Sequence, residues 1–223
     1  MKIDITPFRH FSFDLWLTLI KSNPLFKKKR DQLFKDFFSI EYSIDKVSEV
    51  VRSYDKVCNK INDKTGIHIE TNQLYCLILN DLGVDIDKIE VEKLEEFYQE
   101  TATLFMNYKP LLVYPSINNL FKEIQSNGKS ASILSNTAFI KGRTLRKVLT
   151  HYELESYFSF QLYSDEIGYS KPNQKAFELL LNKANKINTK SIGKNMIVHI
   201  GDNIIADYQG AIKSGIQSIL IKN

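Results

Sequence analysis

Cysteine, histidine and long apolar runs are scarce in this 223-residue sequence, and each scarcity excludes a class of protein. The two cysteines, Cys58 and Cys76, form no CxxC pair and accompany only four scattered histidines, so neither a disulfide framework nor a zinc site is predicted. The longest uninterrupted apolar run, Leu74 to Leu79, is far shorter than the roughly 20 residues of a membrane span. We therefore expect no membrane partner, and a reducing cytoplasm as the location.

A strong charge of one sign is also missing. The 30 Lys and Arg residues exceed the 26 Asp and Glu residues by a net charge of +4, which gives no reason to expect a nucleic-acid partner. The basic run from Lys27 to Arg30 is expected to form the solvated face of a helix, since Phe26, Leu33 and Phe34 would form its opposite face. Asp14 interrupts the first apolar stretch, so we expect no signal peptide.

Two kinds of apolar periodicity divide the chain. Residues 10–20 are typical of a buried strand that leads into a loop, and from Pro24 to about Tyr108 the apolar residues recur at helical spacing. After Pro110, helical segments alternate with short apolar strands, which are expected near residues 131–134, 158–163, 196–200 and 218–221.

This alternation predicts an α/β fold, in which a parallel sheet carries helices on both faces. The helical segment interrupts this alternation between the first predicted strand and the later ones. We therefore expect a core domain formed by residues 1–20 and 111–223, and an inserted all-helical domain formed by residues 21–110.

Polar residues follow the predicted strands, at the edge where ligands meet parallel α/β sheets. They are Asp14, Thr18, Ser135, Asn136, Lys171, Asp202, Asn203 and Asp207. Carboxylates and an ammonium that converge with hydroxyl and amide groups can hold a divalent metal together with an anion such as phosphate. Magnesium fits, because it binds a few carboxylates and takes its other ligands from substrate and water.

Simpler structural roles compete with these functional ones. An unpaired Asp14 in a buried strand would be costly, so a functional role is favoured for it. Asp202 and Asn203 can cap the helix that follows them, which is compatible with metal binding by Asp202. Thr18 is expected to support its loop, and His199, inside a predicted buried strand, is expected to be neither a ligand nor a base.

Four segments, FDLWLTL, ILSNT, SKPNQKAF and HIGDNIIAD, occur in this order across the chain. They resemble the four motifs of the haloacid dehalogenase-like (HAD) hydrolase superfamily, and the helical insert after the first motif resembles the C1 cap of that family. The resemblance implies a Rossmann-like core with an inserted all-helical C1 cap. It also implies a hydrolase that works through an aspartyl-enzyme ester.

The resemblance implies a role for each matching residue. Asp14 would be the nucleophile, Ser135 would hydrogen-bond the phosphoryl oxygens together with Asn136, and Lys171 would neutralise their charge.

A magnesium ion is implied as well. Asp14, Asp202 and the backbone carbonyl of Trp16 would bind Mg²⁺, while Asp207 would orient Lys171 or metal-bound water. Asn203 and Thr18 would support this site.

Trp16 departs from the family pattern. Phosphatases of the family carry a second aspartate at this position, which protonates the leaving alcohol and later activates water, and an indole can do neither. The loss of a positioned acid and base costs about 10²–10⁴-fold in rate. Trp16 is instead expected to pack between the core and the insert, or to contact an apolar part of the substrate.

Three functions remain compatible with Trp16. The first is hydrolysis of a small phosphorylated metabolite whose leaving group needs no proton or receives it from elsewhere. The second is cleavage of a carbon–halogen bond by a 2-haloacid dehalogenase, or phosphonatase-type chemistry. Gly201 and Asp202 favour the first, because the dehalogenases of the family lack this pair, and no cap lysine suited to phosphonatase chemistry is singled out. The third is a catalytically weakened protein that binds a phosphorylated ligand.

Overall fold

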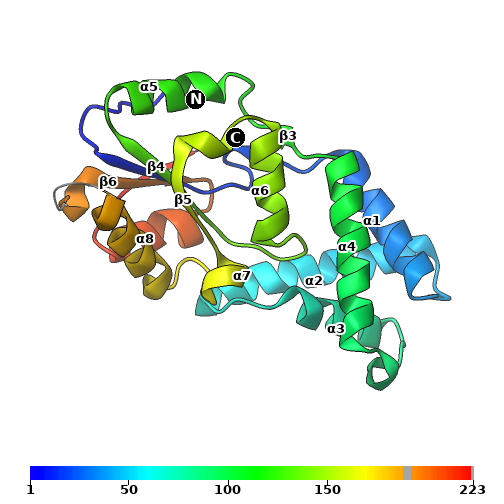
Figure 1. The fold of residues 1–223 in the computed structure, drawn as a ribbon. Coiled ribbons are helices and arrows are strands. Elements are labelled where there is room, and N and C mark those ends of the chain that lie inside the picture. The colour runs from blue at the N-terminus through cyan, green and yellow to red at the C-terminus, as the bar shows by residue number, and fades with distance from the viewer. Residues whose placement is uncertain (188–191, 222–223) are drawn as a thin grey trace.

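The computed structural model describes residues 1–187 and 192–221. Within them the main sheet has five strands, all parallel, in the order β5-β4-β1-β6-β7 (Figure 1). The strands are β1 (His10–Phe13), β4 (Ser130–Ser135), β5 (Phe158–Tyr163), β6 (Ile197–Gly201) and β7 (Gln217–Leu220). The predicted α/β fold with a parallel central sheet is confirmed.

Helices cover both faces of the sheet because successive strand residues point to opposite sides. Ile133 belongs to an apolar cluster with residues of α5 (Ile117–Ser126) and α6 (Gly142–His151). Its neighbour Leu134 belongs to a second cluster with residues of α8 (Gln174–Ile187) and α9 (Gly210–Lys213).

The first strand is shorter than the apolar pattern around it. The pattern continues to residue 20, but β1 ends at Phe13, and the chain then reverses. The backbone N–H groups of Leu19 and Ile20 both donate to the carbonyl of Leu15, and Leu17 has a positive φ of 57°. Such a conformation is uncommon outside glycine and is often found at functional sites. The turn leaves Asp14 at the carboxyl end of the sheet.

The segment between residues 21 and 110 contains four long helices, which lie to the side of the sheet and beneath it (Figure 1). They are α1 (Pro24–Phe37), α2 (Ile44–Thr65), α3 (Thr71–Asp81) and α4 (Val91–Asn107). Both ends of the segment meet in a two-stranded antiparallel pair, β2 (Ile20–Lys21) with β3 (Leu111–Leu112). Aromatic rings join the helices, since Phe97 of α4 contacts Phe34 of α1 and Tyr75 of α3.

Several short helices complete the described part of the chain. They are η1 (Ile86–Lys88), η2 (Glu155–Tyr157), α7 (Ser164–Ile167), η3 (Lys194–Met196) and η4 (Ile204–Gln209). The predicted last helix is thus split into η4, a π-helix, and α9. No helix among residues 1–187 and 192–221 combines the length and apolar character that crossing a bilayer requires.

Gly66 attaches the C-terminus of α2 to the core. It caps the helix with a φ of 64°, and a Cβ atom there would lie 2.6 Å from Cβ of Asn173, so only glycine fits. Its carbonyl accepts hydrogen bonds from the backbone N–H of Ser170 (3.0 Å) and from Nδ2 of Asn173 (3.3 Å). The end of α2 is therefore fixed beside Lys171.

His10 is buried in the sheet and fully hydrogen-bonded. Its Nδ1 lies 2.7 Å from Oγ of Ser130 and its Nε2 lies 2.9 Å from Oγ of Ser132, while its ring stacks on Phe160. Burial lowers the pKa of His10 to about 3, because the imidazolium would lose its hydration.

We predict that His10 makes the fold less stable in acid. The unfolded chain binds a proton near pH 6.5, before the folded chain does, so the free energy of unfolding falls below that pH by up to about 1.4 kcal/mol per pH unit. Urea unfolding between pH 4 and 7 should show this slope in the wild type and a flatter one in His10→Gln. His151→Gln, at an exposed histidine, is the control. An unchanged slope in His10→Gln would contradict the prediction.

Candidate active site

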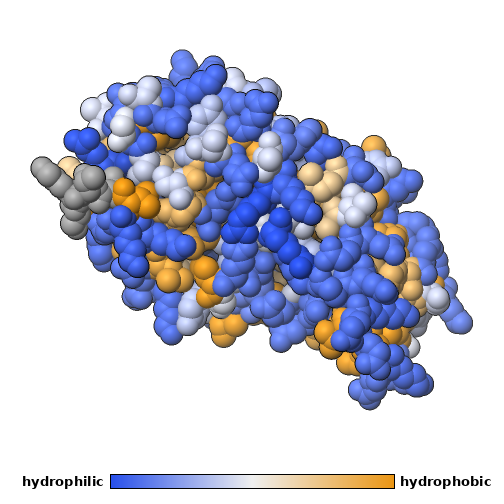
Figure 2. Space-filling view, viewed as in Figure 1, coloured by the Kyte–Doolittle hydropathy of each residue, from blue (hydrophilic) through white to orange (hydrophobic). Residues whose placement is uncertain are grey.

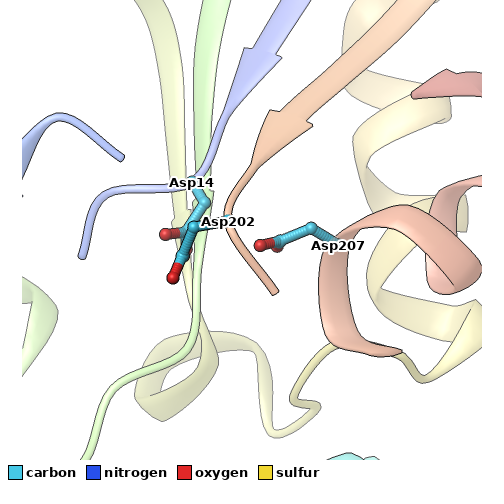
Figure 3. A group of neighbouring side chains, drawn as sticks. All are labelled: Asp14, Asp202 and Asp207. Atoms are coloured by element: carbon cyan, nitrogen blue, oxygen red, sulfur yellow. The ribbon is translucent and has the colours of Figure 1, made fainter. Parts of the chain in front are cut away.

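A buried ion triad lies at the carboxyl end of the sheet. Nζ of Lys171 donates to Oδ1 of Asp14 at 2.7 Å and to Oδ1 of Asp207 at 2.6 Å. Lys171 is only 2% exposed. In Figure 3, Asp14 and Asp202 follow neighbouring strands and Asp207 points toward them from a helix. Residues 14, 171 and 207, which are far apart in the sequence, therefore form one charged centre.

Asn136 holds Lys171 through its backbone. The Asn136 Oδ1 accepts a hydrogen bond from the Lys171 N–H (2.7 Å), and its Nδ2 donates to the Lys171 carbonyl (2.9 Å). The buried Ser135 hydroxyl donates to the Asn136 carbonyl at 3.3 Å. Asn136 thus supports the lysine directly and lines the pocket, whereas the hydrogen bond of Ser135 goes to Asn136.

Asp207 reaches Lys171 because Gly201 has no side chain. A Cβ atom on Gly201 would lie 2.2 Å from Cγ of Asp207, so any larger residue there would displace the Asp207 carboxylate. Asp207 lies in the π-helix η4, a rare conformation that is frequent at functional sites. Asn203 starts this helix: its side chain accepts from the N–H groups of Ile205 and Ala206, and its own N–H donates to Oδ2 of Asp207 (2.9 Å). The predicted capping role of Asn203 is confirmed.

His199 contacts the site, although no ligand or base role was expected for it. Its Nε2 lies 3.0 Å from Oδ1 of Asp207, and its Nδ1 lies 2.9 Å from the Ser12 hydroxyl. Burial and then Lys171 lower the pKa of His199, so the neutral ring donates from Nε2 and accepts from Ser12. Ser12 and His199 are register partners on adjacent strands. The sequence signal for this contact is that Ser12 and His199 are polar residues within otherwise apolar strands.

The charges of the triad are strongly coupled. Burial raises the pKa of Asp14 to about 7, against the opposing attraction of Lys171. Burial would also raise the pKa of Asp207, but Lys171 and His199 hold it below its ordinary value. Burial would lower the pKa of Lys171, but the two carboxylates raise it above the ordinary value. The lysine is therefore charged in the folded protein.

Asp14, Asp202 and Asp207 form a candidate metal centre. One carboxylate oxygen from each lies within 4.8 Å of the others. With all groups ionised, Lys171 compensates only one of the three negative charges, and burial followed by repulsion from Asp207 raises the pKa of Asp202. Oxygen ligands and two uncompensated charges fit a hard divalent cation such as Mg²⁺.

A pocket of about 350 Å³ lies above these carboxylates, which is the size of a small-molecule site. Its lining comes partly from the helical segment: Phe26, Lys27, Arg30, Asp55, Asn59, Asn62 and Asp63. Figure 2 shows that hydrophilic residues cover most of the face in view, with apolar residues in scattered patches.

The loop after Asp14 forms part of the pocket wall. Trp16 is half-buried in the lining and its ring contacts Phe105 of α4, with the ring centres 6.0 Å apart. Trp16 therefore packs against a helix of the segment between residues 21 and 110. Thr18 is buried beneath the loop, and its hydroxyl has no hydrogen-bond partner among the described residues.

A model of the haloacid dehalogenase-like hydrolase family matches residues 12–221. The chain belongs to this family. The glyceraldehyde 3-phosphate phosphatase of Methanothermobacter thermautotrophicus is 23% identical over 209 residues, which cover 84% of each chain. Among solved structures, the magnesium-bound HAD-hydrolase YfnB of Bacillus subtilis aligns with a TM-score of 0.70 and 15% identity over 96% of this chain and 88% of its own.

The 2-haloacid dehalogenase of Pseudomonas syringae aligns with a TM-score of 0.60 and 18% identity over 96% of this chain and 86% of its own. At these identities the structural matches establish the fold alone. Together with the family match, they confirm the predicted superfamily and a hydrolase-class enzyme.

We predict that Lys171→Met destabilises the fold by about 3–5 kcal/mol at pH 8, because it leaves two buried carboxylates without a cation. Without Lys171, the pKa values of Asp14 and Asp207 are expected to be higher in the folded than in the unfolded protein. The loss in free energy of unfolding should therefore grow as pH rises and be smaller at pH 5. Urea unfolding at both pH values measures it. Lys186→Met, at an exposed lysine of α8, is the control. A pH-independent loss below about 1 kcal/mol, the size expected for a surface pair, would contradict the prediction.

Proposed function

We propose that the protein is a Mg²⁺-dependent phosphohydrolase that acts on a small phosphorylated metabolite through an aspartyl-phosphate on Asp14. The observation that supports this most is the Asp14–Lys171–Asp207 triad beside Asp202 at the base of a pocket of about 350 Å³. The likeness to a glyceraldehyde 3-phosphate phosphatase supports the phosphate ester class of substrate.

Each residue has a role that follows from its position. The Asp14 carboxylate attacks phosphorus, and the bond from phosphorus to the leaving oxygen breaks. The Lys171 ammonium, already 2.7 Å from Asp14, attracts the phosphoryl oxygens, and the Ser135 hydroxyl hydrogen-bonds one of them after turning from Asn136. Water then attacks the phosphorus of the aspartyl-phosphate, which releases phosphate and restores Asp14.

Asp14, Asp202 and the backbone carbonyl of Trp16 would hold the metal. When bound, Mg²⁺ supplies charge neutralisation at the phosphoryl oxygens. Asp207 then remains the partner of Lys171, in agreement with its 2.6 Å contact and with the hydrogen bond from His199.

Residues 21–110 would act as a C1 cap on the core formed by residues 1–20 and 111–223. The β2–β3 pair is where the chain enters and leaves this segment, and α1 and α2 supply the pocket residues opposite Asp14. A cap in this position excludes water from the reaction and contacts the leaving group. Specificity would therefore depend on α1 and α2.

We expect acetyl phosphate to be hydrolysed only with Mg²⁺ present, since acetate leaves without a proton and so avoids the missing acid at position 16. Asp14→Asn should reduce phosphate release to the buffer rate, because an amide is a poor nucleophile. The exposed variant Asp4→Asn should match the wild type. Activity in Asp14→Asn would refute the nucleophile, and wild-type protein inactive on every phosphate ester would favour a ligand-binding role.

We also expect Mg²⁺ to stabilise the wild-type fold. At 100 times its dissociation constant, the ion should add about 2.7 kcal/mol to the free energy of unfolding. Asp202→Asn should remove most of this gain, because it deletes a ligand charge. Thermal unfolding with MgCl₂ or with NaCl of equal ionic strength measures the effect. Equal stabilisation of both proteins would show that Asp202 is no ligand.

A further inference from the structure

An alkyl phosphate needs a proton for its leaving oxygen, and Trp16 cannot provide one. The pocket has other carboxylates, however, and two of them lie on α2 of the helical segment: Asp55 and Asp63. Asp14, Asp202 and Asp207 already have roles at the nucleophile, the metal and the lysine. The α2 carboxylates are therefore the remaining acids in the described pocket wall.

Asp63 is connected to the triad through a single residue. Its Oδ1 accepts a hydrogen bond from Nδ2 of Asn203 at 3.4 Å, and the Asn203 N–H donates to Oδ2 of Asp207 at 2.9 Å. This contact joins residues 140 positions apart and brings the end of α2 onto η4. Asp55 lies two helical turns earlier, and within the described part of the chain it forms no hydrogen bond or ion pair with a residue of the triad.

The anchor at Gly66 fixes the position of Asp63. Gly66 follows Asp63 by three residues and is bonded to Ser170 and Asn173, on either side of Lys171 in the sequence. The last turn of α2 is thus attached to the segment that carries the catalytic lysine. While these bonds hold, Asp63 stays in the wall of the pocket that also contains Asp14.

Asn62 indicates that this face of α2 contacts a ligand. It is 3% exposed and lines the pocket, yet its Oδ1 has no hydrogen-bond partner among the described residues. A buried polar atom without a partner is destabilising, and a hydroxyl of a bound substrate would supply the missing hydrogen bond.

The surroundings of Asp63 favour its protonated form. Burial raises its pKa above the ordinary value; the hydrogen bond from Asn203 opposes this shift, and the negative charge of Asp207 adds to it. A carboxyl group that retains its proton more readily than a solvated aspartate is suited to donate it to an alkoxide.

We propose that Asp63 is the general acid and base of the reaction, supplied by the helical segment in place of a carboxylate at position 16. The proposal rests on the proposed phosphohydrolase function. When Asp14 attacks, the electron pair of the breaking P–O bond goes to the leaving oxygen, which takes the proton of Asp63. The products are aspartyl-phosphate, the alcohol and the Asp63 carboxylate. Water then attacks phosphorus and gives its proton to Asp63, while the P–O bond to Asp14 breaks and phosphate leaves.

Asp63→Asn tests this role because the amide keeps an oxygen for Asn203 but has no proton to donate. The measured quantity is kcat/KM, which reports the steps up to loss of the leaving group, for acetyl phosphate and for a series of alkyl phosphates with leaving alcohols of rising pKa. Asp63→Asn should lower kcat/KM for the alkyl phosphates by about 100-fold or more. Acetyl phosphate should change by less than about threefold, since acetate leaves without a proton.

Asp45→Asn is the matched control, because it removes an exposed carboxylate from the same helix at a residue outside the pocket lining. Its ratio of alkyl to acetyl kcat/KM should equal that of the wild type. An equal loss on all substrates in Asp63→Asn, or no loss, would overturn the acid role, as would wild-type hydrolysis of acetyl phosphate alone. Failure of the phosphohydrolase function itself is distinct, since acetyl phosphate would then not be hydrolysed by the wild type.

Discussion

The buried ammonium of Lys171 is the interaction on which the rest of the site depends. A lysine that is 2% exposed survives only with close counter-charges, and Asp14 and Asp207 supply them at 2.7 and 2.6 Å. Neighbouring residues maintain these two ion pairs: Asn136 hydrogen-bonds the backbone of Lys171, and Gly201 leaves room for the Asp207 side chain. The burial of these charges is costly, and Asp207 receives two further hydrogen bonds, from His199 and from the Asn203 N–H.

Three carboxylates cluster at the site, and Lys171 compensates the charge of only one of them. Burial, followed by repulsion from Asp207, raises the pKa values of both Asp14 and Asp202. A divalent cation would relieve that repulsion, which is the electrostatic reason to propose one here. The fold tolerates the repulsion between these carboxylates because two apolar clusters, on opposite faces of the sheet, stabilise it.

The apolar periodicity of short sequence segments predicted the sheet. The same segments contain Asp14, Lys171 and Asp202, so these site residues could be predicted as well. The periodicity did not predict His199 as a partner of Asp207, because a histidine in an apolar strand has the same local pattern whether or not it faces a functional carboxylate. The Asp63–Asn203 contact could not be predicted from the sequence either, because it joins residues 140 positions apart and forms only when α2 packs against η4.

Trp16 has a physical reason to replace an acid in this particular site. A fourth carboxylate beside Asp14 would add to a cluster that already has two uncompensated charges, whereas an indole adds none and packs on Phe105 of α4. The acid proposed on α2, Asp63, is instead joined to Asp207 of that cluster through Asn203. With Asp63 in the proposed role, proton donation would depend on the contact of α2 with η4, so the helix proposed to contact the leaving group would also control its departure.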